Sequence, residues 1–208
     1  MKIKLCGLKR SEDIEAVNEA GAEYIGFIFV EKSRRYVSPE NAAILKEKLN
    51  PTIQAVGVFV NAEIGFIVEL VKKQVIDVIQ LHGSEDISYM NRLKEAVEIP
   101  VIKAVSMTKS DAEEQIRKWE MSDVDYLLLD SGNGGTGEQF DYSLLKKLGK
   151  ISKPYFLAGG LKPSNLEAAA KNLKETLPYA FDLSSGIETN DFKDSDKIKD
   201  AVRTAHRI

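Results

Sequence analysis

Residues 156–161 have the sequence FLAGGL, and residues 181–188 have the sequence FDLSSGIE. Each segment is a short apolar run that passes into glycine or serine. Small residues at the end of a buried strand let the backbone approach a ligand closely, so that its N–H groups can bind an anion. In a barrel of eight parallel strands, phosphate binds at the loops after strands seven and eight and at a short extra helix. The two segments therefore predict this fold and a phosphorylated substrate.

The rest of the chain alternates short apolar runs with amphipathic segments, several of which open with capping residues such as Ser38. This alternation requires a mostly parallel sheet with right-handed crossovers. The chain contains eight such strand–helix units, which favours a closed barrel over an open sheet of five or six strands. We therefore predict an α/β fold, a single TIM (β/α)8-barrel domain over residues 1–208. The predicted strands are Ile3–Gly7, Tyr24–Val30, Gln54–Val60, Val78–His82, Val101–Val105, Tyr126–Asp130, Tyr155–Gly159 and Ala180–Ser184.

The composition narrows the class of partner. The 208 residues have a net charge of −3, and 43% are hydrophobic, which argues against a nucleic-acid or anionic-membrane partner. No apolar run approaches about 18 residues, so we expect no membrane-spanning helix. The N-terminus resembles a strand rather than a signal peptide, and the single cysteine fits a reducing, cytoplasmic setting. With two histidines and one cysteine, we expect no metal site.

Cys6 and Asp130 stand where the active site of a barrel lies, at the C-terminal ends of predicted strands. Strand alternation places Lys4 on the same face as Cys6, which we expect to face the barrel interior, with the lysine favouring a thiolate. Burial of Asp130 would favour the protonated form, which can donate a proton. The alternatives are a cysteine that serves as a small buried hydrophobe and an aspartate that caps a loop.

Three charges fall inside predicted apolar strands, at Lys4, Lys103 and Asp182. Buried charges persist only when they are paired. We hypothesise a polar layer of these side chains in the barrel interior, below the pocket, with a structural role favoured for Lys103. Side chains on the helix-facing side would contradict this hypothesis.

The loop after the second predicted strand contains Arg34 and Arg35, which could form a guanidinium fork for a substrate carboxylate or a solvated charged loop. His82 ends the fourth predicted strand and could line the pocket or hydrogen-bond to neighbouring loops. We expect the other histidine, His206, to face solvent.

A glycine-rich loop follows Asp130 and matches the G-x-G-x-x-G pattern at Gly132, Gly134 and Gly137. A dinucleotide site should open a helix directly and carry an acidic residue about 20 positions later on the next strand. The next strand here has no acid. We interpret the loop as a mobile cover or ligand rim rather than a nucleotide site.

Taken together, the motifs resemble the phosphoribosylanthranilate isomerases, the tryptophan-pathway enzymes, in order from end to end. The K-x-C-G, Q-L-H-G, G-G-T-G and D-x-S-S-G-x-E blocks are specific in combination. The matching segments are KLCGLKRSEDIEAVNEAGAEYIGFIFVEKSRRYVSPE, VGVFVN, IQLHG, IKAV, LLLDSGNGGTGEQFDY, LAGGLKPSN and DLSSGIE.

The resemblance implies a TIM barrel that converts N-(5′-phosphoribosyl)anthranilate to 1-(2-carboxyphenylamino)-1-deoxyribulose 5-phosphate by an Amadori rearrangement, without metal or organic cofactor. It implies that Cys6 is the general base, that Asp130 is the general acid and that Arg35 binds the anthranilate carboxylate. His82 and Asp182 are implied pocket residues. The phosphate is implied to bind at Gly159, Gly160, Ser184, Ser185 and Gly186. Family members include monomers and homodimers, and the sequence leaves this choice open.

Two departures from the family pattern concern loops near the site. Lys9 stands where the family usually has threonine, beside Cys6, which could alter local loop geometry or substrate contacts. The family's G-x-K-D pattern is altered to DFKD at residues 191–194, where we expect the extra helix.

Two other functions remain open at this stage. Another phosphosugar barrel, such as the aldose–ketose isomerase of histidine synthesis or an indole-glycerol-phosphate synthase or lyase, would share the phosphate site. The histidine enzyme resembles an aspartate–aspartate site, whereas the first strand here ends at Cys6. A non-catalytic phospholigand sensor would not need both Cys6 and Asp130.

Overall fold

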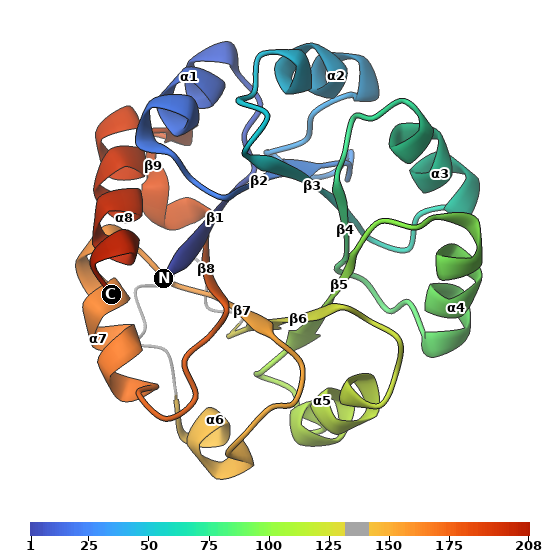
Figure 1. The fold of residues 1–208 in the computed structure, drawn as a ribbon, viewed down its shortest axis with the longest axis vertical. Coiled ribbons are helices and arrows are strands. Elements are labelled where there is room, and N and C mark those ends of the chain that lie inside the picture. The colour runs from blue at the N-terminus through green and yellow to red at the C-terminus, as the bar shows by residue number, and fades with distance from the viewer. Residues whose placement is uncertain (132–141) are drawn as a thin grey trace.

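A computed structural model describes residues 1–131 and 142–208 of the chain. Eight parallel strands pair in chain order, and the last pairs with the first, so the sheet closes into a barrel ringed by helices (Figure 1). The single-domain TIM barrel predicted from the sequence is confirmed. Its strands are β1 (Lys2–Cys6), β2 (Tyr24–Ile28), β3 (Gln54–Phe59), β4 (Val78–Leu81), β5 (Val101–Ser106), β6 (Tyr126–Asp130), β7 (Tyr155–Ala158) and β8 (Ala180–Leu183).

The helices follow the strands in alternation, and one of them begins at the predicted cap Ser38. Ser38 caps the helix that begins at Pro39 by accepting a hydrogen bond from the Asn41 N–H, and Asp86 caps the helix that begins at Ile87 in the same way. The helices are α1 (Ser11–Ala20), α2 (Pro39–Glu47), α3 (Ile64–Lys72), α4 (Ile87–Ala96), α5 (Ala112–Glu120), α6 (Ser143–Leu148), α7 (Leu166–Asn172) and α8 (Ser195–Arg207), with 3₁₀ turns η1 (Pro163–Asn165) and η2 (Ser185–Ile187).

Most predicted strands extend one or two residues past the observed C-terminal ends. Glycines account for two of these differences, because Gly7 has φ 82° and Gly159 has φ 98°. A left-handed residue cannot continue a strand. The chain therefore turns at these glycines and exposes its backbone at the barrel mouth.

Strand alternation divides the core into two layers. A small cluster fills the barrel interior and includes Tyr24, Val56 and Phe156. A larger cluster packs between the strands and the helices and includes the alternate positions, such as Ile25 and Leu157. Each strand is thus buried on both faces, as parallel strands in α/β proteins are.

Lys4 and Asp182 form a buried ion pair between the adjacent strands β1 and β8. The lysine Nζ donates to both carboxylate oxygens, at 3.0 and 2.9 Å, and the Lys4 side chain is fully buried. This part of the predicted polar layer is present. The assignment of Lys103 to the same layer is wrong, because Lys103 pairs with Glu85 at 2.7 Å and lies 5.6 Å from the centre of the Trp119 ring, on the helix-facing side of β5.

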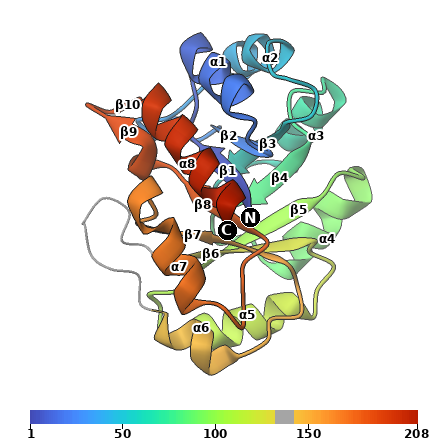
Figure 2. The same ribbon diagram turned by 60° about the vertical axis from the view of Figure 1, so that its left-hand side comes forward.

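A two-stranded hairpin follows β8, formed by β9 (Glu188–Thr189) and β10 (Phe192–Lys193) (Figure 2). The prediction that DFKD marks an extra helix is wrong for that segment. Asn190 and Asp191 adopt left-handed backbone angles, φ 50° and φ 65°, which suit a tight turn. The extra helical turn is η2, which comes immediately after β8.

None of the helices within residues 1–131 and 142–208 is long and apolar enough to cross a membrane.

Candidate active site

A cavity of about 380 Å³ opens at the C-terminal ends of the barrel strands. Nearly all of the candidate residues from the sequence line it. Gly186 is the exception. The lining residues are Cys6, Ile28, Val30, Ser33, Arg35, Val58, Val60, Gln80, His82, Asp130, Ala158, Gly159, Gly160, Leu161, Asp182, Ser184 and Ser185.

Cys6 is buried at the end of β1 and contributes to the cavity wall. Its thiol fits because β2 has a glycine beside it: a Cβ on Gly26 would lie 2.6 Å from the Cys6 Sγ. Burial raises the pKa of the Cys6 thiol, and the nearby Lys4 and Lys193 ammonium groups oppose that shift. The cation predicted beneath the thiol is present, but its effect on the pKa of the thiol is smaller than that of burial.

Asp130 ends β6 and faces the cavity with a side chain that is 29% exposed, so it is less buried than expected. Its Oδ2 lies 3.7 Å from Nε2 of His82. Burial lowers the pKa of His82, although the charge of Asp130 opposes this effect. His82 therefore lines the cavity as a neutral imidazole at neutral pH.

Gln80 lies two residues before His82 on β4, on the same face of the strand. Its Nε2 lies 2.9 Å from Nδ1 of His82. The amide can only donate in this contact, so Nδ1 accepts and the ring proton is on Nε2, toward Asp130. Within the described residues, the buried Gln80 Oε1 has no hydrogen-bond partner. Gln80 itself is one of the residues that line the cavity.

Arg35 reaches the cavity from the loop after β2, but its guanidinium is already held by protein. Nε donates to Oε1 of Glu188 at 2.6 Å, and Nη2 donates to Oε2 at 2.9 Å. The arginine side chain passes over Gly7, where a Cβ would lie 2.5 Å from the Arg35 Cδ. The Glu188 carboxylate raises the pKa of Arg35, which fixes it as a cation beside the cavity.

The loops after β7 and β8 present backbone to the cavity. Gly159 and Gly160 have left-handed backbone angles, φ 98° and φ 62°, and both line the cavity with Ser184 and Ser185. Gly186 lies behind this wall, where a Cβ would come within 1.9 Å of the Leu161 carbonyl oxygen. Its missing side chain lets the two loops meet. The arrangement can bind an anion through main-chain N–H groups.

The cavity residues enter from different sides. β7 and β8 separate β1 from β6 in the barrel, so Cys6 and Asp130 flank the loops that follow those two strands. A sugar phosphate held by the loops would lie between a thiol and a carboxyl group. This arrangement can move protons between neighbouring atoms of the sugar.

The remaining predictions concern loops and an outlying histidine. Lys9 does not line the cavity; its Nζ donates to the Arg34 carbonyl oxygen at 2.8 Å and so ties the first loop to the second. His206 is exposed, as predicted, and contacts Glu23. The G-x-G-x-x-G residues Gly132, Gly134 and Gly137 lie outside the described residues.

The sequence analysis missed Gln80, Glu188 and Lys193 as individual site residues. Gln80 could have been found from the spacing, since a glutamine two residues before His82 shares its face of the strand. Glu188 contacts Arg34 and Arg35, which are 154 and 153 residues away in the chain, so no local pattern reveals these contacts. Lys193 contacts Glu188 and Ser184 because the chain folds back in the hairpin that follows β8. Among the described residues, no three His, Cys, Asp or Glu side chains gather to hold a metal ion.

Comparison with known proteins shows which family the chain matches. The model of the N-(5′-phosphoribosyl)anthranilate (PRA) isomerase family matches residues 3–204. The chain is 44% identical to N-(5′-phosphoribosyl)anthranilate isomerase from Endomicrobium trichonymphae over 206 residues, which is 97% of this chain and 96% of the relative.

Two solved structures of phosphoribosyl anthranilate isomerases align with this chain over the full length of both proteins. One, at 33% identity and a TM-score of 0.86, is a phosphoribosyl anthranilate isomerase in complex with reduced 1-(o-carboxyphenylamino)-1-deoxyribulose 5-phosphate. The other, also at 33% identity with a TM-score of 0.85, is a monomeric form generated from the dimeric isomerase of Thermotoga maritima.

Proposed function

The chain belongs to the N-(5′-phosphoribosyl)anthranilate isomerase family, and we propose that Cys6 and Asp130 carry the proton transfers of its reaction. The chain is an isomerase of tryptophan biosynthesis, which converts N-(5′-phosphoribosyl)anthranilate to 1-(2-carboxyphenylamino)-1-deoxyribulose 5-phosphate. The observation that supports the residue assignment is that a thiol and a carboxyl group line one cavity on opposite flanks of the glycine-serine loops.

The rearrangement needs one acid and one base. Protonated Asp130 donates a proton to the furanose ring oxygen, and the C1′–oxygen bond breaks to give a ring-opened Schiff base. Cys6, as a thiolate, removes the proton from C2′, and the electron pair moves to form an enolamine. The enolamine then tautomerises to the aminoketone. Proton transfers of this kind accelerate a reaction by about 10² to 10⁴ each.

The rest of the cavity holds the substrate in place. The Gly159–Gly160 and Ser184–Gly186 segments bind the phosphate, and Arg35 binds the anthranilate carboxylate. The two anionic groups of the substrate are thus held on either side of the sugar. This fixes the reacting carbons of the sugar relative to the acid and the base. His82 and Asp182 contribute to the cavity wall, and Asp182 also keeps Lys4 charged beneath the thiol.

Residues 1–208 act as one domain in this proposal, in which the ends of strands throughout the barrel contribute to one cavity. The proposal is the same for a monomer and for a homodimer, in which each subunit would carry one such cavity. A reducing cytoplasmic compartment suits the proposed base, because oxidation of the Cys6 thiol would remove it.

A spectroscopic turnover assay with phosphoribosylanthranilate tests the activity. We expect turnover by the purified chain without added metal or cofactor. Phosphosugar isomerisation without anthranilate turnover would indicate the histidine-pathway type of enzyme, and binding of the substrate without turnover would indicate a sensor. The residue assignment is tested separately by the Cys6 and Asp130 variants discussed below.

A further inference from the structure

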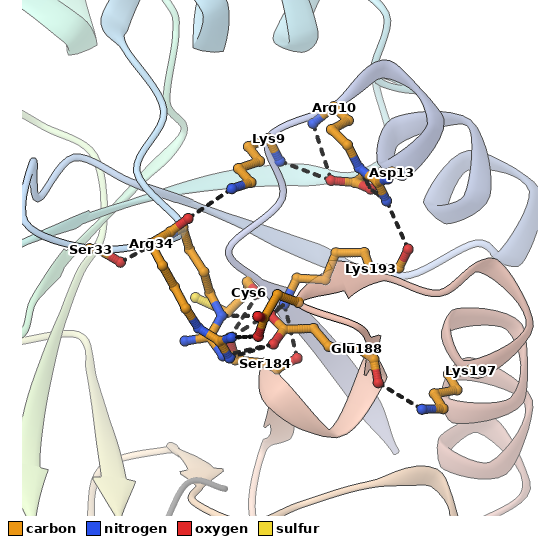
Figure 3. A network of polar contacts seen from close by, with 12 residues as sticks. Cys6, Lys9, Arg10, Asp13, Ser33, Arg34, Ser184, Glu188, Lys193 and Lys197 are labelled. Atoms are coloured by element: carbon orange, nitrogen blue, oxygen red, sulfur yellow. Dashed lines mark hydrogen bonds and ion pairs between the residues drawn. The ribbon is translucent and has the colours of Figure 1, made fainter.

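The hairpin β9–β10 carries two buried charges that the reaction steps do not use, Glu188 and Lys193. Their side chains are 6% and 3% exposed and meet at 2.7 Å. Figure 3 shows them beside Cys6 and Ser184, with Arg34 reaching Glu188 from the opposite side. A buried pair of this kind is weak evidence for stability alone, because its desolvation offsets much of its attraction. Its position next to the site is the feature that needs an explanation.

Glu188 contacts three cations, and two of them, Arg34 and Arg35, come from a distant part of the chain. Oε1 accepts from Arg35 Nε at 2.6 Å and from Lys193 Nζ at 2.7 Å. Oε2 accepts from Arg35 Nη2 at 2.9 Å and from Arg34 Nη2 at 2.8 Å. The two bonds from Arg35 are a bidentate contact, which fixes the plane and the direction of the guanidinium.

Lys193 joins this contact to Ser184, after β8, and through Ser184 to the backbone of Cys6. Its Nζ donates to Glu188, to the Ser184 carbonyl oxygen at 2.9 Å and, at 3.5 Å, to the Ser184 Oγ. The Ser184 Oγ in turn donates to the Cys6 carbonyl oxygen at 3.1 Å. The contacts therefore run without a break from Arg35 to the backbone of Cys6.

We propose that Glu188 and Lys193 are positioning residues for the isomerisation: Glu188 fixes the guanidinium of Arg35, and Lys193 holds Ser184 and places a buried positive charge beside the thiol of Cys6. This inference rests on the proposed roles of Arg35 and Cys6. The pair would therefore affect both substrate binding and proton transfer. Glu188 sets the orientation of Arg35, which binds the carboxylate, and Lys193 favours the thiolate form of Cys6, which acts as the base.

Four charged groups act on the thiol. Lys4 lies below it on β1, and its charge favours the thiolate; Asp182 on β8 has the opposite effect. Lys193 on β10 also favours the thiolate, and the charges of Cys6 and Arg35 attract each other. Lys4 is already paired with Asp182, so the net positive charge near the thiol comes from the cluster around Glu188. Arg34, Arg35 and Lys193 all contact Glu188, and Arg34 also pairs with the exposed Asp191.

Alkylation of the thiol tests the role of Lys193 without relying on turnover. Cys6 is the sole cysteine of the chain, so the rate of its reaction with iodoacetamide as a function of pH reports its ionisation directly. We expect Lys193→Met to raise the midpoint by about one pH unit, and Lys193→Arg to restore it toward the wild-type value. An unchanged midpoint in Lys193→Met overturns the electrostatic role. Where Lys193→Met does not fold, Lys193→Gln gives the same test.

The role of Glu188 is tested by steady-state kinetics of Glu188→Gln. We expect KM for phosphoribosylanthranilate to rise about tenfold, with a smaller change in kcat, because the amide cannot hold the guanidinium as a charged partner. Glu120→Gln is the matched control: Glu120 is 7% exposed, pairs with Arg117, and contacts Ser152 before β7 at the opposite end of the barrel. Its KM should stay at the wild-type value.

Two further variants separate this inference from the proposed function. If Cys6→Ala keeps wild-type turnover or Arg35→Ala keeps wild-type KM, the proposed residue roles fail, and the positioning role fails with them. If both lose function as expected while Glu188→Gln keeps its KM and Lys193→Met its alkylation midpoint, only the positioning inference is overturned. A purely structural pair would lower the unfolding temperature of the variants and leave the alkylation midpoint in place.

Discussion

Nε2 of His82 lies 3.7 Å from Oδ2 of Asp130, and the pKa of the histidine is lowered by burial. The Gln80 contact places the ring proton of His82 on Nε2, so the imidazole presents an N–H on the side where Asp130 lies. Both side chains line the cavity, and in the proposed mechanism the carboxyl group of Asp130 is the general acid.

Asp130→Asn tests the acid. The amide keeps the size of the side chain but cannot donate a proton to the ring oxygen, so we expect kcat to fall at least about a hundredfold. The product should still bind, because its phosphate and carboxylate anchors are intact. Product affinity is measured by fluorescence titration alongside turnover, and a kcat close to wild type would contradict the assignment.

Cys6→Ala tests the base. Removal of the thiol leaves the anchors in place but leaves no group to take the C2′ proton, so turnover should again fall at least about a hundredfold. The measurement is single-turnover conversion of phosphoribosylanthranilate under saturating enzyme, which separates the chemical step from binding. A single-turnover rate that matched the wild type would mean that the proton leaves by another route.

Arg35→Ala tests the carboxylate anchor. We expect KM to rise by an order of magnitude or more, about 1.4 kcal/mol per factor of ten, while kcat changes less. Arg35→Lys keeps the charge but loses the bidentate contact with Glu188, so its KM should fall between those of wild type and Arg35→Ala. Equal KM values for all three proteins would show that the carboxylate binds elsewhere.

The sequence was sufficient for the parts of the site that depend on strand alternation and on strand ends. The alternation placed Lys4 and Cys6 on one interior face, and glycine and serine marked the loops that line the cavity. Lys103 shows the limit of this reasoning: both faces of a parallel strand are buried, so a charge within an apolar run does not reveal its side. Its partner, Glu85, comes from the loop after β4.

Contacts between loops could not be predicted from the sequence for a different reason. Arg35 and Glu188 are 153 residues apart in the chain and meet only because the barrel closes. The hairpin that carries Glu188 depends on left-handed angles at Asn190 and Asp191, for which the segment DFKD gave no strong signal. Local patterns thus predicted which loops reach the cavity, but not the contacts that order them.

The ion pairs of Glu188 predict a stability that depends on pH. Burial by itself would raise the pKa of Glu188, but hydrogen bonds from Arg35 and Lys193 outweigh it and lower the pKa to about 2, against an ordinary value of 4.5. Because the folded state holds the proton less tightly than the unfolded state, this stabilisation is present above pH 4.5 and is lost as the pH falls through 2. The shift corresponds to at most about 3 kcal/mol at neutral pH, since solvent at the barrel mouth screens part of the attraction.

Urea unfolding of wild type and Glu188→Gln at several pH values checks this expectation. The wild-type advantage should be largest near pH 7 and should shrink by about half at pH 3, where the other carboxylates affect both proteins alike. An advantage that did not change between pH 7 and pH 3 would show that Glu188 stabilises the fold by packing rather than by its charge.

Gly186 offers the final test, because its missing side chain lets the loops after β7 and β8 meet, although Gly186 does not line the cavity. A Cβ at this position would lie 1.9 Å from the Leu161 carbonyl oxygen, so Gly186→Ala must push the loops after β7 and β8 apart. We expect KM to rise about tenfold and competitive inhibition by inorganic phosphate to weaken to a similar extent, since both ligands use these loops. Gly65→Ala is the control: a Cβ on this exposed glycine of α3 would have no atom within 4 Å, and the change should leave KM unaltered and stabilise the helix by about 0.5–1 kcal/mol. Wild-type inhibition by phosphate in Gly186→Ala would place the phosphate site away from these two loops.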